Sequence, residues 1–167
     1  MNTFRRGLLL CLLLAATAGC DRVTKHLAVT TLAGSPSQSF LAGTLRLDYH
    51  ENPGAFLGVG STWRPEVRSG LFLIGNAFFL LATAVVAIRF RWSRPAMVGL
   101  VLFLSGGASN LIDRFAFGSV IDFLNVGLGP FRTGIFNVAD MAIIAGVAIL
   151  LFEGYRAQRP GASLTRS

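Results

Sequence analysis

The stretch GLFLIGNAFFLLATAVVAI, residues 70–88, carries no charged side chain over 19 positions. A helix that crosses the hydrocarbon core of a bilayer needs about 20 mostly apolar residues. The stretch 95–112 is uncharged as well, and 135–152 holds a single charge, Asp140. The first apolar run, 7–19, is short unless its helix continues beyond it. The pattern predicts four membrane spans, at about 7–30, 70–90, 95–112 and 135–153.

The overall composition agrees with a membrane protein. Of the 167 residues, 53% are apolar and 14% are charged, and the mean hydropathy is +0.60. Soluble domains carry about 25% charged residues, so a free globular domain and a disordered chain are both disfavoured. Cys11 and Cys20 give no disulfide framework, and the two histidines, His26 and His50, form no zinc-binding cluster with them.

The net charge of +7 lies on one side of the predicted topology. Eight arginines and one acid, Glu153, flank the spans on that side, whereas cations and acids balance on the other. The positive-inside rule places the basic side in the cytoplasm, so both termini are cytoplasmic and the loops 33–69 and 113–134 face outward. The dispersed cations argue against a nucleic-acid partner. We expect one integral-membrane domain over 1–155 and a disordered cytoplasmic tail over 156–167.

The outer segments predict a small sheet. Residues 44–50 alternate apolar and polar side chains, as a half-buried strand does, and 52–54 reads as a turn before a second possible strand at 55–59. Residues 61–69 suit a helix in the headgroup layer, and 125–132 is a Gly-rich loop or short strand. The predicted fold class is an all-α membrane protein: four transmembrane helices with a small extracytoplasmic β-sheet and an interfacial helix.

The first helix has an alternative interpretation. Residues 17–20, TAGC, follow a basic and an apolar stretch and are similar to the end of a bacterial lipoprotein signal, whose cysteine is lipid-modified. The mature chain would then begin at Cys20. However, Thr17 stands where such signals usually have Leu, and cleavage would leave an odd number of spans. We therefore expect an uncleaved first helix.

Three acids gather around the ends of the third and fourth apolar runs. Asp113 precedes Arg114, so a local ion pair or a helix-end role suffices for it. The topology allows Asp122 and Asp140 to meet on the outer face. Two carboxylates in a low-dielectric site share one proton, and such a pair can activate water and protonate a leaving amine. Alternatively, Asp140 is a first-turn acid of the last helix and Asp122 a loop acid.

Other polar residues lie at the same level. Asn110 ends the third apolar run and Asn137 begins the fourth, and either could cap a helix or hold a carboxylate by hydrogen bond. Asp21 and Lys25 are one helical turn apart, a spacing that usually marks a surface ion pair. The turn at 52–54 is explained by a plain hairpin.

Five segments, taken together, resemble the lipoprotein signal peptidase family, also called signal peptidase II. They occur in the family's order: DRVTK (21–25), NPGAF (52–56), GGASNLIDR (106–114), VIDF (120–123) and FNVAD (136–140). Ser109 stands where the family commonly has Gly, and because serine is small we expect the helix contact there to survive.

The resemblance implies a metal-independent aspartyl endopeptidase of the bacterial inner membrane, without a cofactor. It would cut prolipoproteins before a diacylglyceryl-modified cysteine, at the periplasmic side, as a monomer in contact with membrane lipid. The family's catalytic aspartates match Asp122 and Asp140. Its supporting positions match Asp21, Lys25, Asn52, Gly54, Asn110, Asp113, Arg114 and Asn137. The competing class is a non-enzymatic membrane transport or assembly protein, in which the acids relay protons or contact a partner.

Overall fold

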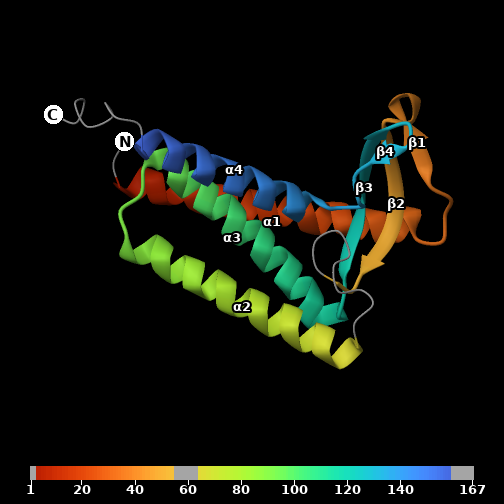
Figure 1. The fold of residues 1–167 in the computed structure, drawn as a ribbon, viewed down its shortest axis with the longest axis horizontal. Coiled ribbons are helices and arrows are strands. Elements are labelled where there is room, and N and C mark those ends of the chain that lie inside the picture. Colours follow the sequence, from red (N-terminus) through yellow and green to blue (C-terminus); the bar gives the residue numbers. More distant parts are fainter. Residues whose placement is uncertain (1–2, 55–63, 159–167) are drawn as a thin grey trace.

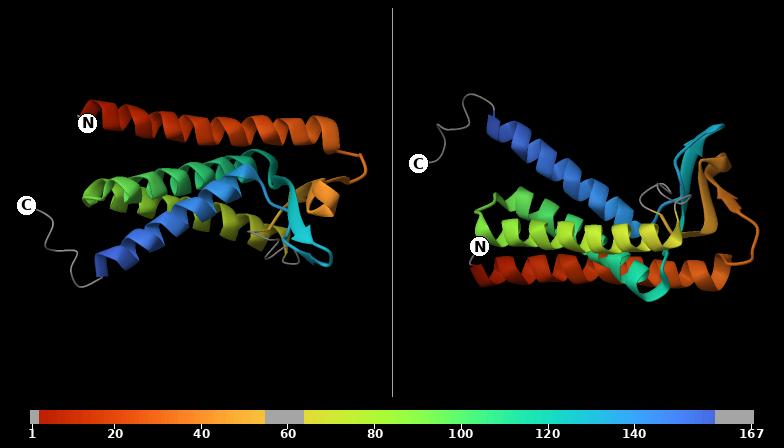
Figure 2. Two further views of the ribbon diagram at one scale, coloured as in Figure 1. Left: turned by 90° about the horizontal axis from the view of Figure 1, so that it is seen from above. Right: turned by 60° about the horizontal axis from the view of Figure 1, so that its bottom comes forward.

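In a computed structural model, which describes residues 3–54 and 64–158, long helices lie side by side and a small sheet closes one end of the bundle (Figure 1). The helices are α1 (Thr3–Leu32), α2 (Pro65–Arg89), α3 (Arg94–Phe117) and α4 (Val138–Gln158). The start of α1, the α2–α3 connection and the end of α4 lie opposite the sheet (Figures 1 and 2). The end of α1, the end of α3 and the start of α4 therefore lie together at the end of the bundle that carries the sheet (Figure 1).

Within the described residues, three helices are long and apolar enough to cross a membrane: α1 over Gly7–Leu32, α3 and α4. These confirm three of the predicted membrane helices. The remaining predicted span, 70–90, coincides with α2 up to its last residue, Arg89. The last helix continues to Gln158, so the tail predicted from 156 begins inside α4, and 159–167 lie outside the described residues.

The boundaries of α2 correct one prediction. The separate interfacial helix expected at 61–69 is absent from its described part, because 65–69 form the first turns of α2. Pro65 occupies the first turn, where a missing N–H costs nothing, and the helix then runs unbroken to Arg89. Residues 61–63 and the strand expected at 55–59 lie outside the described residues.

The sheet has four antiparallel strands in the order β1 (Gln38–Phe40), β2 (Leu45–Asn52), β3 (Val120–Leu128) and β4 (Phe131–Arg132). The strand predicted at 44–50 is confirmed by β2. The 113–134 segment is not simply a loop, since α3 continues to Phe117 and β3 follows at once. The register of β2 on β3 places His50 opposite Asp122, so Asp122 is a strand residue and not the loop acid considered above.

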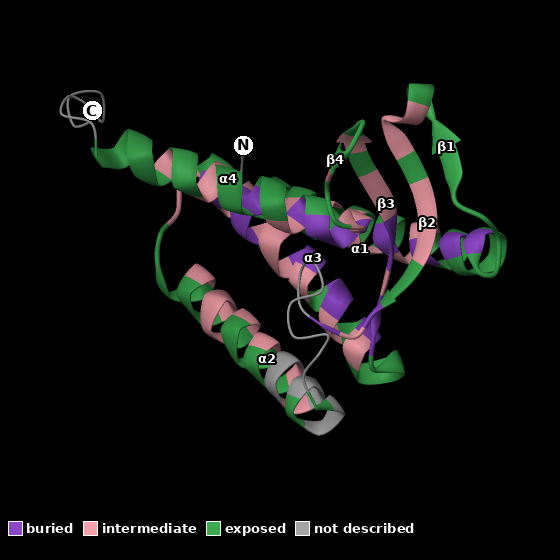
Figure 3. Cartoon of the chain, turned by 45° about the vertical axis from the view of Figure 1, so that its right-hand side comes forward, coloured by how far each residue is buried: buried purple, intermediate pink, exposed green. Residues whose placement is uncertain are grey.

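The most buried side chains of the described chain are largely polar. Asp21, Asp113, Asp122 and Asn137 rank with Val120 as the largest side chains that are fully enclosed. Figure 3 shows the buried residues gathered where α1, α3 and α4 meet β3, while the outer faces of the helices remain exposed. Apolar outer faces suit contact with lipid. The protein therefore encloses a polar centre at the junction of helices and sheet.

Candidate active site

Asn137 immediately precedes α4 and forms a reciprocal cap with Asp140. The backbone N–H of Asp140 donates to the Oδ1 of Asn137 at 2.9 Å, and the backbone N–H of Asn137 donates to an oxygen of Asp140 at 3.2 Å. Such a capping box satisfies two N–H groups that a helix start leaves without partners. The capping role predicted for Asn137 and the first-turn position predicted for Asp140 are both confirmed.

Asp122 is held by two amide side chains. Asn137 Nδ2 donates to its Oδ1 at 2.6 Å, and Asn52 Nδ2 donates to its Oδ2 at 2.9 Å. The carboxylate is almost completely buried. Burial raises the pKa of Asp122 above its usual value, against the opposing effect of the hydrogen bonds from Asn52 and Asn137.

Asn137 links the two carboxylates. It bonds Asp122 through its side-chain N–H and Asp140 through its backbone N–H and side-chain oxygen. The other oxygen of Asp140 accepts from Asn110 Nδ2 at 2.9 Å. Two acids that lie 18 positions apart in the sequence thus meet around one asparagine. Each oxygen accepts one of these N–H groups and has further lone-pair capacity for water.

Asp21 and Lys25 form a buried pair, which corrects the expectation of a surface ion pair. Their charged atoms lie 2.6 Å apart, and the side chains are 0% and 4% exposed. Lys25 Nζ also lies 2.7 Å from Asp113 and donates to Asn110 Oδ1 at 2.8 Å. Asp21 accepts the backbone N–H of Ala139 at 2.9 Å. This ion pair of α1 therefore supports both Asn110 and the first turn of α4.

Two further side chains complete this network, and the sequence analysis assigned neither a role. Arg22 lies 2.5 Å from Asp113, so Asp113 is paired with α1 and not with the adjacent Arg114. Ser109 donates its hydroxyl to Asp21 at 2.6 Å. The sequence points to these two residues only through their positions, because both fall inside the motif segments quoted above. Their partners, however, are 91 and 88 residues away.

Arg114 joins the end of β2 to α3. Its guanidinium donates to the backbone oxygens of Gly54 at 2.8 Å and of Asn110 at 3.2 Å. Asn52 Oδ1 accepts the N–H of Gly54 at 3.0 Å, which closes a local turn. The predicted turn at 52–54 is therefore tied to the same helix that carries Asn110, and it positions Asn52 against Asp122.

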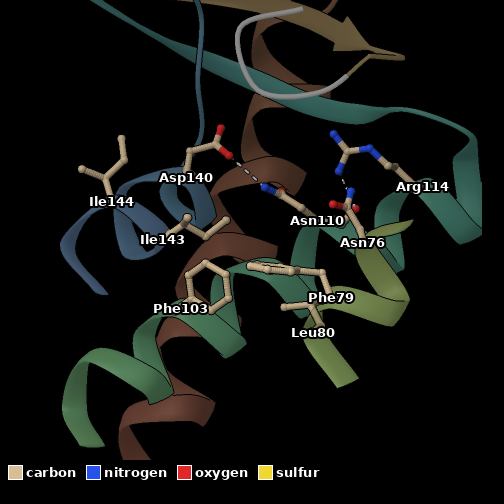
Figure 4. A pocket seen from close by; sticks show the side chains of 10 residues that line it. Asn76, Phe79, Leu80, Phe103, Asn110, Arg114, Asp140, Ile143 and Ile144 are labelled. Atoms are coloured by element: carbon tan, nitrogen blue, oxygen red, sulfur yellow. Dashed lines mark hydrogen bonds between the residues drawn. The ribbon is translucent and has the colours of Figure 1, made fainter. Parts of the chain in front are cut away.

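A cavity of about 370 Å³ opens beside Asp140. Figure 4 shows Asp140, Asn110 and Arg114 at one end of it. Its remaining lining includes Phe79, Leu80, Phe103, Ile143, Ile144 and Asn76. The cavity thus joins a carboxylate to apolar walls. Within residues 3–54 and 64–158, no three His, Cys, Asp or Glu side chains are grouped so that they could hold a metal ion.

The fold and the site define a class. The chain is a helical membrane protein in which two buried carboxylates share one asparagine, and one of the two, Asp140, lines an apolar-walled cavity. Paired carboxylates in a low-dielectric setting suit acid–base hydrolysis.

Comparisons with known proteins are consistent with this class. The family model described as Signal peptidase (SPase) II matches residues 13–156. A lipoprotein signal peptidase of Desulforapulum autotrophicum is 36% identical over 92% of this chain and 94% of its own, and one of Geobacter metallireducens is 38% identical over 83% and 85%. Two solved structures of a bacterial membrane enzyme, both 24% identical, share the fold. Their TM-scores are 0.76 and 0.77, over 89% and 87% of this chain and 88% and 91% of theirs. The chain belongs to the signal peptidase II family, which consists of proteases.

Proposed function

We propose that the protein removes signal peptides from bacterial prolipoproteins by cutting before a diacylglyceryl-modified cysteine, with Asp122 and Asp140 as the catalytic pair. Membership of the signal peptidase II family supports the reaction. The observation that carries the assignment of the residues is the shared Asn137, which bonds both carboxylates, one of which, Asp140, lines a cavity.

The chemistry follows from a carboxylate pair that holds one proton. The ionised aspartate takes a proton from a water molecule, and the water oxygen bonds to the carbonyl carbon of the residue before the cysteine. The protonated aspartate donates to the carbonyl oxygen as negative charge develops there. When the tetrahedral intermediate collapses, the first aspartate gives the proton it took from water to the departing cysteine amine, and the C–N bond breaks. The second aspartate takes a proton back from a hydroxyl of the intermediate as the new carboxyl group forms, so the pair again holds one proton.

The supporting residues orient this pair. Asn52, Asn110 and Asn137 donate N–H groups to its oxygens. Asp21, Lys25, Asp113 and Arg114 act one step further away, because they fix the amides or the helix starts that contact the carboxylates. These are positioning roles.

The proposed topology has four spans, with α2 as the additional one, in the bacterial inner membrane. The basic residues of the α2–α3 connection and of the two helix ends lie opposite the sheet (Figure 1), and the positive-inside rule assigns that end to the cytoplasm. Both termini are then cytoplasmic and the carboxylates face the periplasm. The first helix is proposed to stay uncleaved, because cleavage before Cys20 would leave an odd number of spans.

The substrate would enter sideways from the bilayer. It would bind to a single copy of this chain. The cavity beside Asp140 lies between α2, α3 and α4, and its aromatic and aliphatic lining suits the diacylglyceryl chains. Its polar end, at Asp140 and Arg114, suits the scissile peptide.

The decisive experiment replaces each aspartate by its uncharged isostere. We expect Asp122→Asn and Asp140→Asn to lose at least about 10³-fold in cleavage of a purified lipid-modified precursor, since each removes half of an acid–base pair. Asp48→Asn, on the same sheet but outside the network, is the matched control and should keep wild-type activity. Full activity in either site variant, with normal membrane insertion, would refute the pair.

Mass spectrometry of the mature chain should find residue 1 retained, whereas a lipidated Cys20 would favour the non-enzymatic alternative.

A further inference from the structure

A second cavity, of about 590 Å³, lies on the other side of the buried ion network. It is bounded by the outer part of α1, the end of α3 and the facing parts of β2 and β3, and it shares no lining residue with the cavity beside Asp140. The reaction proposed above uses neither its space nor most of its side chains.

One wall of this cavity presents a carboxylate without a cationic partner. Glu51 accepts hydrogen bonds from Tyr49 Oη at 2.8 Å and from Ser119 Oγ at 3.5 Å, and the described residues offer it no ion pair. Burial, together with Glu51, raises the pKa of Tyr49 to about 12, so the phenol remains a donor at physiological pH. Glu51 is thus oriented by two hydroxyls and left exposed to a ligand.

The opposite wall presents partly used cationic groups. The side chain of Arg22 is 38% exposed, although one of its terminal nitrogens pairs with Asp113 and the other donates to the backbone oxygen of Ser109 at 3.1 Å. His26, the next lining position along α1 after Lys25, is exposed, and its side chain forms no hydrogen bond or ion pair within the described part of the chain. Lys25 is enclosed between Asp21 and Asp113 and is neutralised there.

These walls select a zwitterion. The uncompensated charge of Glu51 favours an ammonium group, and a ligand that is only cationic would meet Arg22. A ligand that also carries a phosphate places it near Arg22 and His26, where a guanidinium can donate to it. The carboxylate and the guanidinium lie on different walls of one cavity, as the two charges of a phosphoethanolamine group require.

The rim of the cavity is apolar and borders the spanning helices. Phe117 and Val29 line it and are exposed, on α3 and α1. Under the proposed topology this is the outer end of both helices, where lipid headgroups lie. We propose that the second cavity binds one zwitterionic phospholipid through a phosphoethanolamine headgroup, with Glu51 receiving the ammonium. This site rests on the proposed membrane orientation and is independent of the catalytic assignment.

The test compares lipids that differ in a single property. Full-length protein in detergent is mixed with dioleoyl phosphatidylethanolamine, phosphatidylcholine or phosphatidylglycerol, and the retained lipid is measured by native mass spectrometry. Phosphatidylcholine has the same charges but no N–H to donate to a carboxylate, so we expect phosphatidylethanolamine to bind about five- to tenfold more tightly than it. Glu51→Gln should abolish this preference, and Asp48→Asn, on the same strand but outside the cavity, should retain it.

Competitors identify the source of the headgroup. Displacement of the lipid by soluble phosphoethanolamine would show that the headgroup suffices, and displacement only by lipids would show that the chains contribute. Both outcomes support the site. Equal retention of phosphatidylethanolamine and phosphatidylcholine, an unchanged preference in Glu51→Gln, or equally effective displacement by inorganic phosphate would overturn it. Because the readout is lipid binding, the result does not depend on whether Asp122 and Asp140 catalyse cleavage.

Discussion

Gly106 of α3 packs tightly against the first turn of α4, next to Asp140. A Cβ atom added at Gly106 would lie 2.4 Å from the backbone oxygen of Ala139 and 3.0 Å from Ile143 Cγ1. Ordinary contacts begin near 3.4 Å, so the start of α4 must retreat by about 1.0 Å. Ala139 immediately precedes Asp140, and its backbone cannot move without that aspartate. Gly106→Ala is therefore expected to displace Asp140 without removing any polar group.

The expected effect has two parts. Overpacking of an enclosed contact costs about 1–3 kcal/mol of stability, and the better helix propensity of alanine offsets up to about 1 kcal/mol of this. A misplacement of about 1 Å at a reacting group reduces the rate by about 10². We therefore expect Gly106→Ala to lower kcat about 100-fold while lowering Tm only modestly.

Two matched glycines separate packing from positioning. Gly99→Ala makes the same kind of contact at the far end of the helix pair, 2.9 Å from the backbone oxygen of Gly146, and Gly75→Ala on α2 meets nothing within 4 Å. Both should keep kcat within a few-fold of wild type, and Gly99→Ala should share the loss of Tm. The assay is steady-state cleavage of a lipid-modified precursor, alongside thermal unfolding in detergent. Wild-type kcat in Gly106→Ala, or an equal loss in Gly99→Ala, would refute the reasoning.

Two further predictions concern charge. Lys25→Met removes the cation enclosed between Asp21 and Asp113 and should destabilise the protein by about 3–5 kcal/mol; an unchanged Tm in detergent would contradict the burial of this network. Desolvation raises the pKa of Asp122, so the acid limb of the pH profile of kcat/KM should lie above the usual carboxyl value of 3.8, because falling pH protonates both acids and removes the base. The same shift contributes stability that is complete at low pH and is lost as the pH rises through the folded-state pKa; a limb at or below 3.8 would count against Asp122.

The helices and the main strand could be predicted because their signals are local. Apolar runs longer than a bilayer is thick form helices wherever they occur, and the alternation at 44–50 appears as β2. The start of α2 could not be predicted as well, since the polar residues at 65–69 suit either an interfacial helix or the first turns of a longer one. Pro65 begins a helix in both cases, and only the unbroken backbone beyond it decides between them.

The ion network could not be predicted from spacing. Asp21 and Lys25 have the separation of a surface pair, and their burial depends on α3 and α4, which are contributed by residues more than 80 positions away. The pairing of Arg22 with Asp113 could not be predicted either, because Asp113 is followed by Arg114, which is the more obvious ion-pair partner in the sequence.

The capping and the catalytic interpretations of Asn137 were set against each other in the sequence, and the structure joins them. A backbone N–H can only donate, so the bond from Asp140 fixes the side-chain oxygen of Asn137 toward the helix and turns its NH₂ toward Asp122. Lys25 acts likewise on Asn110, since an ammonium cannot accept: it holds the amide oxygen, and the NH₂ faces Asp140. Each carboxylate thus receives a side-chain N–H from an asparagine whose amide oxygen is held by a group that can only donate. The cap at the start of α4 therefore also positions the two carboxylates.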